Sequence, residues 1–159
     1  MNFQGKATLD ASPEEVWAVL LDVDQFAACM PGVEDVTQID GHTFDGTIGA
    51  NVGPMSGKFA FRARIVESDP PREMSARVDG TDSVTKSTMT ADLGITLSPA
   101  GERTELSYRA TVEIKGRLAL LGDMVFRATA VVVLEEFTKR LQVRVLAGGV
   151  RPGGSGDGS

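Results

Sequence analysis

Apolar and polar positions alternate along the first ten residues of the chain. One face of this segment carries Phe3, Gly5, Ala7 and Leu9, and the other carries Gln4, Lys6, Thr8 and Asp10. Strict alternation is typical of a strand with one buried face, so the pattern predicts a half-buried strand over residues 2–10.

Two short helices are expected after this strand. Ser12 is suited to cap the first one, with Pro13 at the first helical position and Glu15 completing a capping box. A second helix is predicted from about Asp22 to residue 29, because Pro31 and Gly32 end the helical pattern.

Between residues 33 and 114 the apolar positions recur at every second residue almost throughout. The rows that share a face are Phe44, Gly46, Ile48, Ala50 and Val52; Phe59, Phe61, Ala63 and Ile65; Met74, Ala76 and Val78; Met89, Ala91, Leu93, Ile95 and Leu97; and Leu106, Tyr108, Ala110, Val112 and Ile114. Short turns rich in Pro and Gly separate these rows, which predicts about six strands in an antiparallel meander.

A long helix is predicted from Leu118 to about Leu146. Its first half, up to Leu134, is apolar nearly all round, and only Asp123 and Arg127 carry charge there. Its second half is amphipathic, with one apolar stripe formed by Leu134, Phe137, Leu141 and Val145. Residues 147–159 contain six glycines and are expected to form a flexible tail, which leaves residues 1–146 as one domain.

This order of elements predicts an α+β helix-grip fold. A curved antiparallel sheet of about seven strands would surround the long C-terminal helix, with two short helices after the first strand. Small residues such as Ala63, Ala91 and Ala110 lie among bulky ones on the inward rows. These small residues allow two interpretations, an incompletely filled pocket or an ordinary core that is packed tightly.

If the interior is a pocket, the sequence also predicts which residues line it. The expected ligand-binding residues are Phe44, Ile48, Phe59, Phe61, Ala63, Met74, Met89, Tyr108, Leu121, Met124, Val125, Ala128 and Val132. This lining is apolar and rich in Met and Phe, so it favours a neutral lipophile over a charged metabolite. The entrance is expected at the hairpin 52–58 and at the start of the long helix, 115–122, with Met55 and Leu120 beside it, because glycines there lower the cost of opening.

Charge and composition exclude several classes of function. The chain of 159 residues has 16 basic and 22 acidic residues and a net charge of −6, which argues against a nucleic-acid partner. The one histidine, His42, falls in a turn-like segment, and the one cysteine, Cys29, is expected to be a small buried residue. No metal site is therefore expected. Because no long apolar run or leader pattern is present, a cytoplasmic protein is predicted.

Several short motifs also resemble a known family. They are Ala11-Ser12-Pro13-Glu14-Glu15-Val16-Trp17, Leu21-Asp22-Val23-Asp24, Met30-Pro31-Gly32-Val33, Val52-Gly53-Pro54-Met55-Ser56-Gly57-Lys58-Phe59, Asp69-Pro70-Pro71, and Ile114-Lys115-Gly116-Arg117-Leu118-Ala119-Leu120-Leu121-Gly122. Together they resemble the CoxG family of carbon monoxide dehydrogenase subunits, within the START-like (SRPBCC) superfamily that includes the birch pollen allergen. The resemblance extends from residue 1 to about residue 146.

The resemblance implies a non-catalytic accessory protein of an aerobic molybdenum-containing carbon monoxide dehydrogenase or a related hydroxylase. It implies that the protein helps to bring the enzyme to the membrane, at the inner face of the cell membrane. It further implies that the pocket holds a quinone, such as menaquinone, or a similar lipid, with no covalently bound cofactor.

Two alternatives to a lipophile carrier remain at this stage. One is an enzyme similar to polyketide cyclases or hydratases, for which Asp92 and Glu113 are the candidate acids or bases, although both alternate out of phase with the apolar rows. The other is a purely structural adaptor that recruits a dehydrogenase. Asp123 and Arg127 lie four residues apart on the helix, so they are expected to pair with each other, or to hydrogen-bond a guest if that face turns inward.

Overall fold

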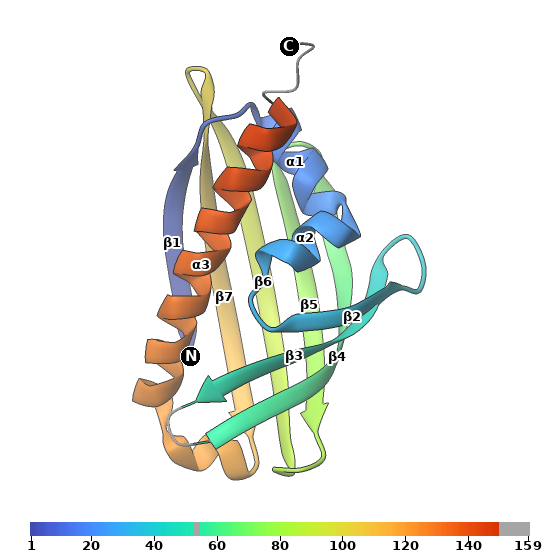
Figure 1. The fold of residues 1–159 in the computed structure, drawn as a ribbon, viewed down its shortest axis with the longest axis vertical. Coiled ribbons are helices and arrows are strands. Elements are labelled where there is room, and N and C mark those ends of the chain that lie inside the picture. Colours follow the sequence, from blue (N-terminus) through green and yellow to red (C-terminus); the bar gives the residue numbers. More distant parts are fainter. Residues whose placement is uncertain (53–54, 150–159) are drawn as a thin grey trace.

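The computed structural model describes residues 1–52 and 55–149 of the chain (Figure 1). Its elements are β1 (Asn2–Leu9), α1 (Pro13–Leu21), α2 (Val23–Cys29), β2 (Val33–Gln38), β3 (Thr43–Val52), β4 (Met55–Asp69), β5 (Glu73–Asp82), β6 (Ser87–Ala100), β7 (Arg103–Lys115), the 3-10 helix η1 (Arg117–Leu121) and α3 (Asp123–Gly149). The predicted elements are all present in the predicted order, and the helix-grip fold is confirmed.

The seven strands form one antiparallel sheet in the order β1-β7-β6-β5-β4-β3-β2. The sheet is a meander from β2 to β7, and β1 joins it beside β7, so β1 and β2 are its two edges. Helix α3 runs along one side of the curved sheet, next to β1, and α1 and α2 pack against its C-terminal half (Figure 1).

Helix α1 starts where the capping residues predict. The Ser12 hydroxyl accepts a hydrogen bond from the Glu15 backbone N–H at 3.2 Å, and the Glu15 carboxylate accepts one from the Ser12 N–H at 3.0 Å. Asp22 caps α2 in the same way, because its carboxylate accepts a hydrogen bond from the Gln25 backbone N–H. The same bond holds the pKa of Asp22 below its usual value.

The long helix is interrupted near its predicted start. Residues 117–121 form the 3-10 helix η1, and α3 begins at Asp123 rather than at Leu118. Gly122 separates the two with a φ of 84°, a left-handed conformation that ends a right-handed helix. At the other end α3 continues to Gly149, three residues into the expected tail, and residues 150–159 lie outside the described part of the chain.

The hydrophobic core consists of two separate clusters at opposite ends of the helix. The upper cluster joins α1, α2 and the C-terminal half of α3 to the sheet around Leu9, Trp17, Leu106 and Leu141. The lower cluster is formed by Phe59, Leu118 and Phe126, with half-buried neighbours packed against them. Between the clusters, the inward side chains of the central strands, such as Val78, Leu93 and Ala110, are only half-buried.

Candidate functional site

The strands place their predicted lining residues on the inner face of the sheet. Along β4, Phe59, Phe61 and Ala63 are buried or half-buried, while the residues between them are exposed. Phe44 and Ile48 on β3, Met74 on β5, Met89 on β6 and Tyr108 on β7 are half-buried on the same face. The structure does not bring all of them together, because Met74 and Tyr108 pack on the upper cluster and Ile48 and Met89 on the lower one.

The predicted inward orientation is wrong for three residues of α3. Met124 is 84% exposed, Val132 is 67% exposed, and Ala128 is also exposed. Leu121 and Val125 do face inward and pack on the lower cluster. The first half of the helix is apolar on every side, so its composition does not indicate which face turns towards the sheet.

The sequence does contain a signal that gives the correct face. Three helical turns take about 11 residues, so the buried Phe137 and Leu141 lie directly above Phe126 and Ala130. Phe126 is indeed buried in the lower cluster, although it was not among the predicted lining residues. Met124 and Ala128 instead lie three turns below Glu135 and Lys139, on the exposed face of the helix.

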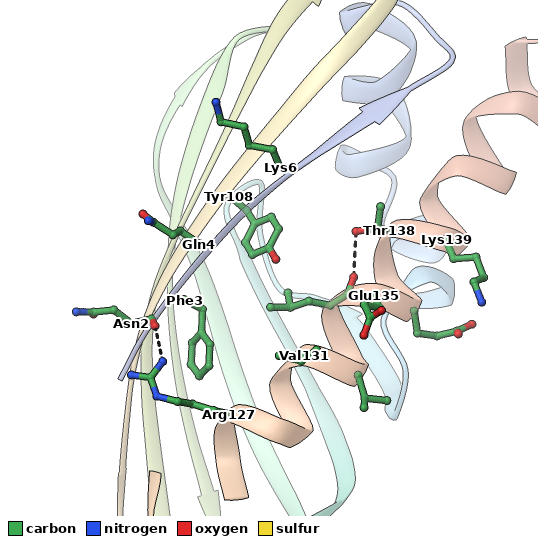
Figure 2. A pocket seen from close by; sticks show the side chains of 13 residues that line it. Asn2, Phe3, Gln4, Lys6, Tyr108, Arg127, Val131, Glu135, Thr138 and Lys139 are labelled. Atoms are coloured by element: carbon green, nitrogen blue, oxygen red, sulfur yellow. Dashed lines mark hydrogen bonds between the residues drawn. The ribbon is translucent and has the colours of Figure 1, made fainter. Parts of the chain in front are cut away.

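A groove of about 820 Å³ lies between the edge strand β1 and helix α3 (Figure 2). It is lined by Asn2, Phe3, Gln4, Lys6, Tyr108, Arg127, Val131, Val132, Leu134, Glu135, Glu136, Thr138 and Lys139. Tyr108 and Val132 are the two predicted lining residues that border it. The groove runs between the levels of the two core clusters, and its size is within the range of small-molecule sites.

Tyr108 reaches this groove because its cross-strand neighbour has no side chain. Gly5 of β1 pairs with Tyr108 of β7, and a Cβ at Gly5 would lie 2.4 Å from the Tyr108 hydroxyl oxygen and 2.6 Å from the ring carbon that bears it. The ring therefore lies over the backbone of β1. Its hydroxyl points towards α3 and makes no hydrogen bond to any other residue drawn in Figure 2.

The free edge of β1 supplies backbone groups to the groove. Met1 and Val112 exchange two hydrogen bonds of 2.8 Å, so the odd-numbered residues of β1 direct their backbone groups towards β7. The even-numbered residues of β1 direct their backbone N–H and C=O groups away from β7, to the free edge of the sheet. The Asn2 carbonyl oxygen accepts a hydrogen bond from Arg127, and the Asp10 N–H donates one to Gln142.

The predicted entrance is held together by two buried polar side chains. The Asp82 carboxylate, which is 4% exposed, accepts hydrogen bonds from the N–H groups of Lys58, Val84 and Thr85. The Ser87 hydroxyl accepts one from the Leu118 N–H at 3.0 Å. The start of β4, the β5–β6 turn and η1 are thereby joined at this end of the fold.

These bonds determine the protonation of Asp82. Burial raises the pKa of its carboxyl group. The hydrogen bonds from the three backbone N–H groups and from the Thr85 hydroxyl lower the pKa by more than burial raises it, so the net pKa is below its usual value.

The two residues predicted beside the entrance differ in exposure. Met55 is half-buried against the lower cluster, and Leu120 is 86% exposed. Residues 53 and 54 of the predicted entrance lie outside the described residues.

The candidate reactive side chains lie away from the groove. Cys29 is fully buried, and burial raises the pKa of its thiol. His42 is exposed in the turn before β3, as predicted. Asp92 and Glu113 are exposed on the outer face of the sheet, also as predicted, and they pair with Arg77 and Lys115.

Metal-binding and membrane-spanning features are absent from residues 1–52 and 55–149. This part of the chain contains no group of three or more His, Cys, Asp or Glu side chains placed to hold a metal ion. None of the helices described there is both long enough and apolar enough to cross a membrane.

Comparison with known families identifies the chain. The sequence profile of CoxG, a subunit of carbon monoxide dehydrogenase, matches residues 5–146. The chain belongs to the CoxG family. Membership indicates an accessory role beside carbon monoxide dehydrogenase for this CoxG protein. Among curated proteins, no match was found.

Solved structures share the fold of this CoxG protein. A conserved protein from Geobacillus kaustophilus is 23% identical with a TM-score of 0.85, over 92% of this chain and 96% of that one. A protein from Thermus thermophilus is 16% identical with a TM-score of 0.69, over 93% and 99% of the two chains. A protein from Chromobacterium violaceum is 21% identical with a TM-score of 0.68, over 91% and 96%. At these identities the likeness shows a common fold.

Proposed function

We propose that this CoxG protein is a non-catalytic carrier of a neutral lipophile, such as a quinone, for a carbon monoxide dehydrogenase. The observation that carries the proposal is the division of the core into two clusters. Apolar side chains between them are half-buried, and the groove beside α3 leads to this level of the fold. A lipophile that covers this apolar surface removes it from water, which contributes about 25 cal/mol per Å² of covered surface to the free energy of binding.

The inward rows favour an uncharged guest. The residues that alternate inward on β3 and β4, such as Phe44, Ile48, Phe59 and Ala63, carry no charge. An ionised group would lose its hydration there without gaining a partner. The carboxylates considered for the enzyme alternative, Asp92 and Glu113, face the opposite side of the sheet, which supports binding over catalysis.

Native mass spectrometry of freshly purified protein tests the carrier role directly. We expect a co-purified lipophile, and we expect added menaquinone to bind. Ala63→Trp fills the inner face of β4 and is expected to lower menaquinone affinity at least ~10-fold. The matched control is Ala60→Trp on the exposed face of the same strand, which is expected to bind as the wild type does. Equal affinity of the two variants would place the guest elsewhere.

The proposal has a second part, contact with the membrane, which exposed apolar side chains on η1 and α3 support. Leu120, Met124, Val131 and Val132 are all more than half exposed, and the last two also line the groove. Exposed apolar patches commonly mark interaction surfaces, and this one adjoins the path that a lipophile would take. We propose that it contacts the inner membrane surface while the guest is exchanged.

Vesicle flotation tests the membrane contact. We expect wild-type protein to float with vesicles of phosphatidylethanolamine and phosphatidylglycerol, and Met124→Glu to lose this association. Val66→Glu, which changes an exposed apolar residue on the sheet, is the control and should float as the wild type does. Equal flotation of both variants would exclude this helix face as the contact.

A further inference from the structure

The hydroxyl group of Tyr108 is a polar atom for which the described part of the chain provides no hydrogen-bond partner. The geometry points to this hydroxyl as the group that binds the polar head of the guest, an uncharged amphiphile whose head carries an acceptor oxygen such as a carbonyl. This inference rests on the proposed function, because it adds the position and the chemistry of the head group to a lipophile carrier.

The position of Tyr108 in its strand is unusual for a polar side chain. The inward row of β7 continues through Ala110, Val112 and Ile114, which are apolar. A buried tyrosine normally finds a hydrogen-bond partner for its hydroxyl within the protein, whereas Tyr108 is half-buried and its hydroxyl keeps contact with solvent. Thr104, the polar residue at the start of this row, has such a partner, because its hydroxyl donates to the Ala11 carbonyl oxygen at 2.7 Å. The Tyr108 hydroxyl instead faces the groove (Figure 2).

The fold creates the space for this arrangement at Gly5. An alanine there would place its Cβ within 2.4–2.8 Å of the hydroxyl end of the tyrosine ring, which is closer than van der Waals contact allows. Gly5 has no positive φ, so the glycine is needed for the close approach of the ring and not for the backbone conformation. The pair therefore aims the hydroxyl across β1 into the groove.

The other polar groups nearby are mostly hydrogen-bond donors. Arg127 uses one of its N–H groups to reach Asn2 and donates no other hydrogen bond within the described residues, and the backbone N–H of Gln4 points to the same edge. These donors fit a head group with one or two acceptor oxygens. Charges of both signs border the groove, Glu135 and Glu136 together with Lys6, Arg127 and Lys139. The preference for an uncharged head therefore comes from the apolar row that continues inward from Tyr108.

The rest of the guest would extend from the groove into the space between the core clusters. Phe3, Val131 and Leu134 provide apolar contacts beside Tyr108, and the half-buried Leu93 and Ala110 lie further inside on the sheet. The head would then lie at the mouth, and the hydrocarbon part would be shielded from water.

Two probes with the same carbon skeleton test the inference. Menadione and 2-methylnaphthalene differ by the two carbonyl oxygens of menadione, and binding of each is measured by NMR titration of the isotope-labelled protein. A neutral hydrogen bond contributes about 3- to 10-fold in affinity. We expect Tyr108→Phe to lower the affinity for menadione by about 5-fold and to leave that for 2-methylnaphthalene unchanged. Thr81→Val, which removes an exposed hydroxyl from β5, is the control and should change neither.

A double-mutant cycle with Gly5→Ala tests the positioning. The added methyl group displaces the tyrosine ring, so Gly5→Ala alone should reduce the preference for menadione as Tyr108→Phe does. In the Tyr108→Phe background it should reduce the preference no further. If Tyr108→Phe keeps the full preference for menadione, the inference is overturned while the carrier role stands. If neither probe binds the wild-type protein, the carrier role and the inference are both overturned.

Discussion

The guanidinium group of Arg127 on α3 donates a hydrogen bond of 3.1 Å to the backbone carbonyl oxygen of Asn2 on β1. The same guanidinium lies 5.4 Å from the centre of the Phe3 ring, in cation–π geometry. Arg127 was expected to pair with Asp123 one helical turn away, but it reaches across the groove to the edge strand instead. It therefore connects the first half of α3 to β1 at the border of the candidate site.

Removing this connection should open the groove. We expect Arg127→Ala to speed the release of bound menaquinone several-fold and to increase amide hydrogen exchange at residues 2–6, because α3 is then free to move away from β1. Arg77→Ala, which breaks an exposed ion pair with Asp92 on the other face of the sheet, is the control. Stopped-flow release and hydrogen-exchange mass spectrometry measure the two effects. Unchanged release in Arg127→Ala would show that the guest leaves by another route.

The inward face of α3 can be verified by stability. Phe126→Ala removes a buried ring from the lower cluster and is expected to cost about 3 kcal/mol. Met124→Ala, two residues away on the exposed face, should change stability by less than about 0.5 kcal/mol. Urea denaturation of both variants gives these values. Equal costs would contradict the helix orientation described above.

Asp82 should make the stability of the protein depend on pH in acid. Its pKa in the folded state lies below the ordinary value of 3.8, so the charged form stabilises the fold. This contribution is present above the ordinary pKa and is lost as the pH falls through the lower pKa of the folded state. Asp82→Asn should therefore destabilise the protein by about 2 kcal/mol at neutral pH, and by clearly less in acid, below the ordinary pKa.

Urea denaturation at neutral pH and in acid measures this difference. Asp79→Asn, which changes an exposed carboxylate on the same strand, should have little effect under either condition. A constant deficit of Asp82→Asn from neutral pH down into acid would rule out the charged form of Asp82 as the source of its stabilisation.

Gly116 is expected to be essential where β7 joins η1. It has a φ of 96°, and a Cβ there would lie 2.1 Å from the Lys86 carbonyl oxygen. Gly101 also has a positive φ, of 68°, but open space surrounds its Cβ position. Both alanine variants carry the strain of a positive φ, about 1–3 kcal/mol, but only Gly116→Ala adds a clash with the backbone, so it should be destabilised beyond Gly101→Ala by more than about 1 kcal/mol. Similar midpoints in thermal denaturation would disprove the contact.

Local signals in the sequence were sufficient for most of the fold. The alternation along β4 placed Phe59 and Phe61 inward, because a strand turns successive side chains to opposite faces. Ser12 and Glu15 located the start of α1, since a capping box uses only neighbouring residues. The amphipathic half of α3 identified Phe137 and Leu141 as buried, because its charged residues left one apolar stripe.

The sequence by itself thus determined the order of elements, the buried faces of β1 and of β3 to β7, and the uncharged character of the inner rows. Tertiary structure alone decided the site. Gly5 and Tyr108 are far apart in the chain, and so are Asn2 and Arg127, so their contacts arise only when β1 pairs with β7 and α3 lies beside β1. The apolar first half of α3 has no polar face of its own, so its inward side can be read only from the apolar stripe of the second half, three turns further on, and packing of Phe126 on the lower cluster agrees with that stripe.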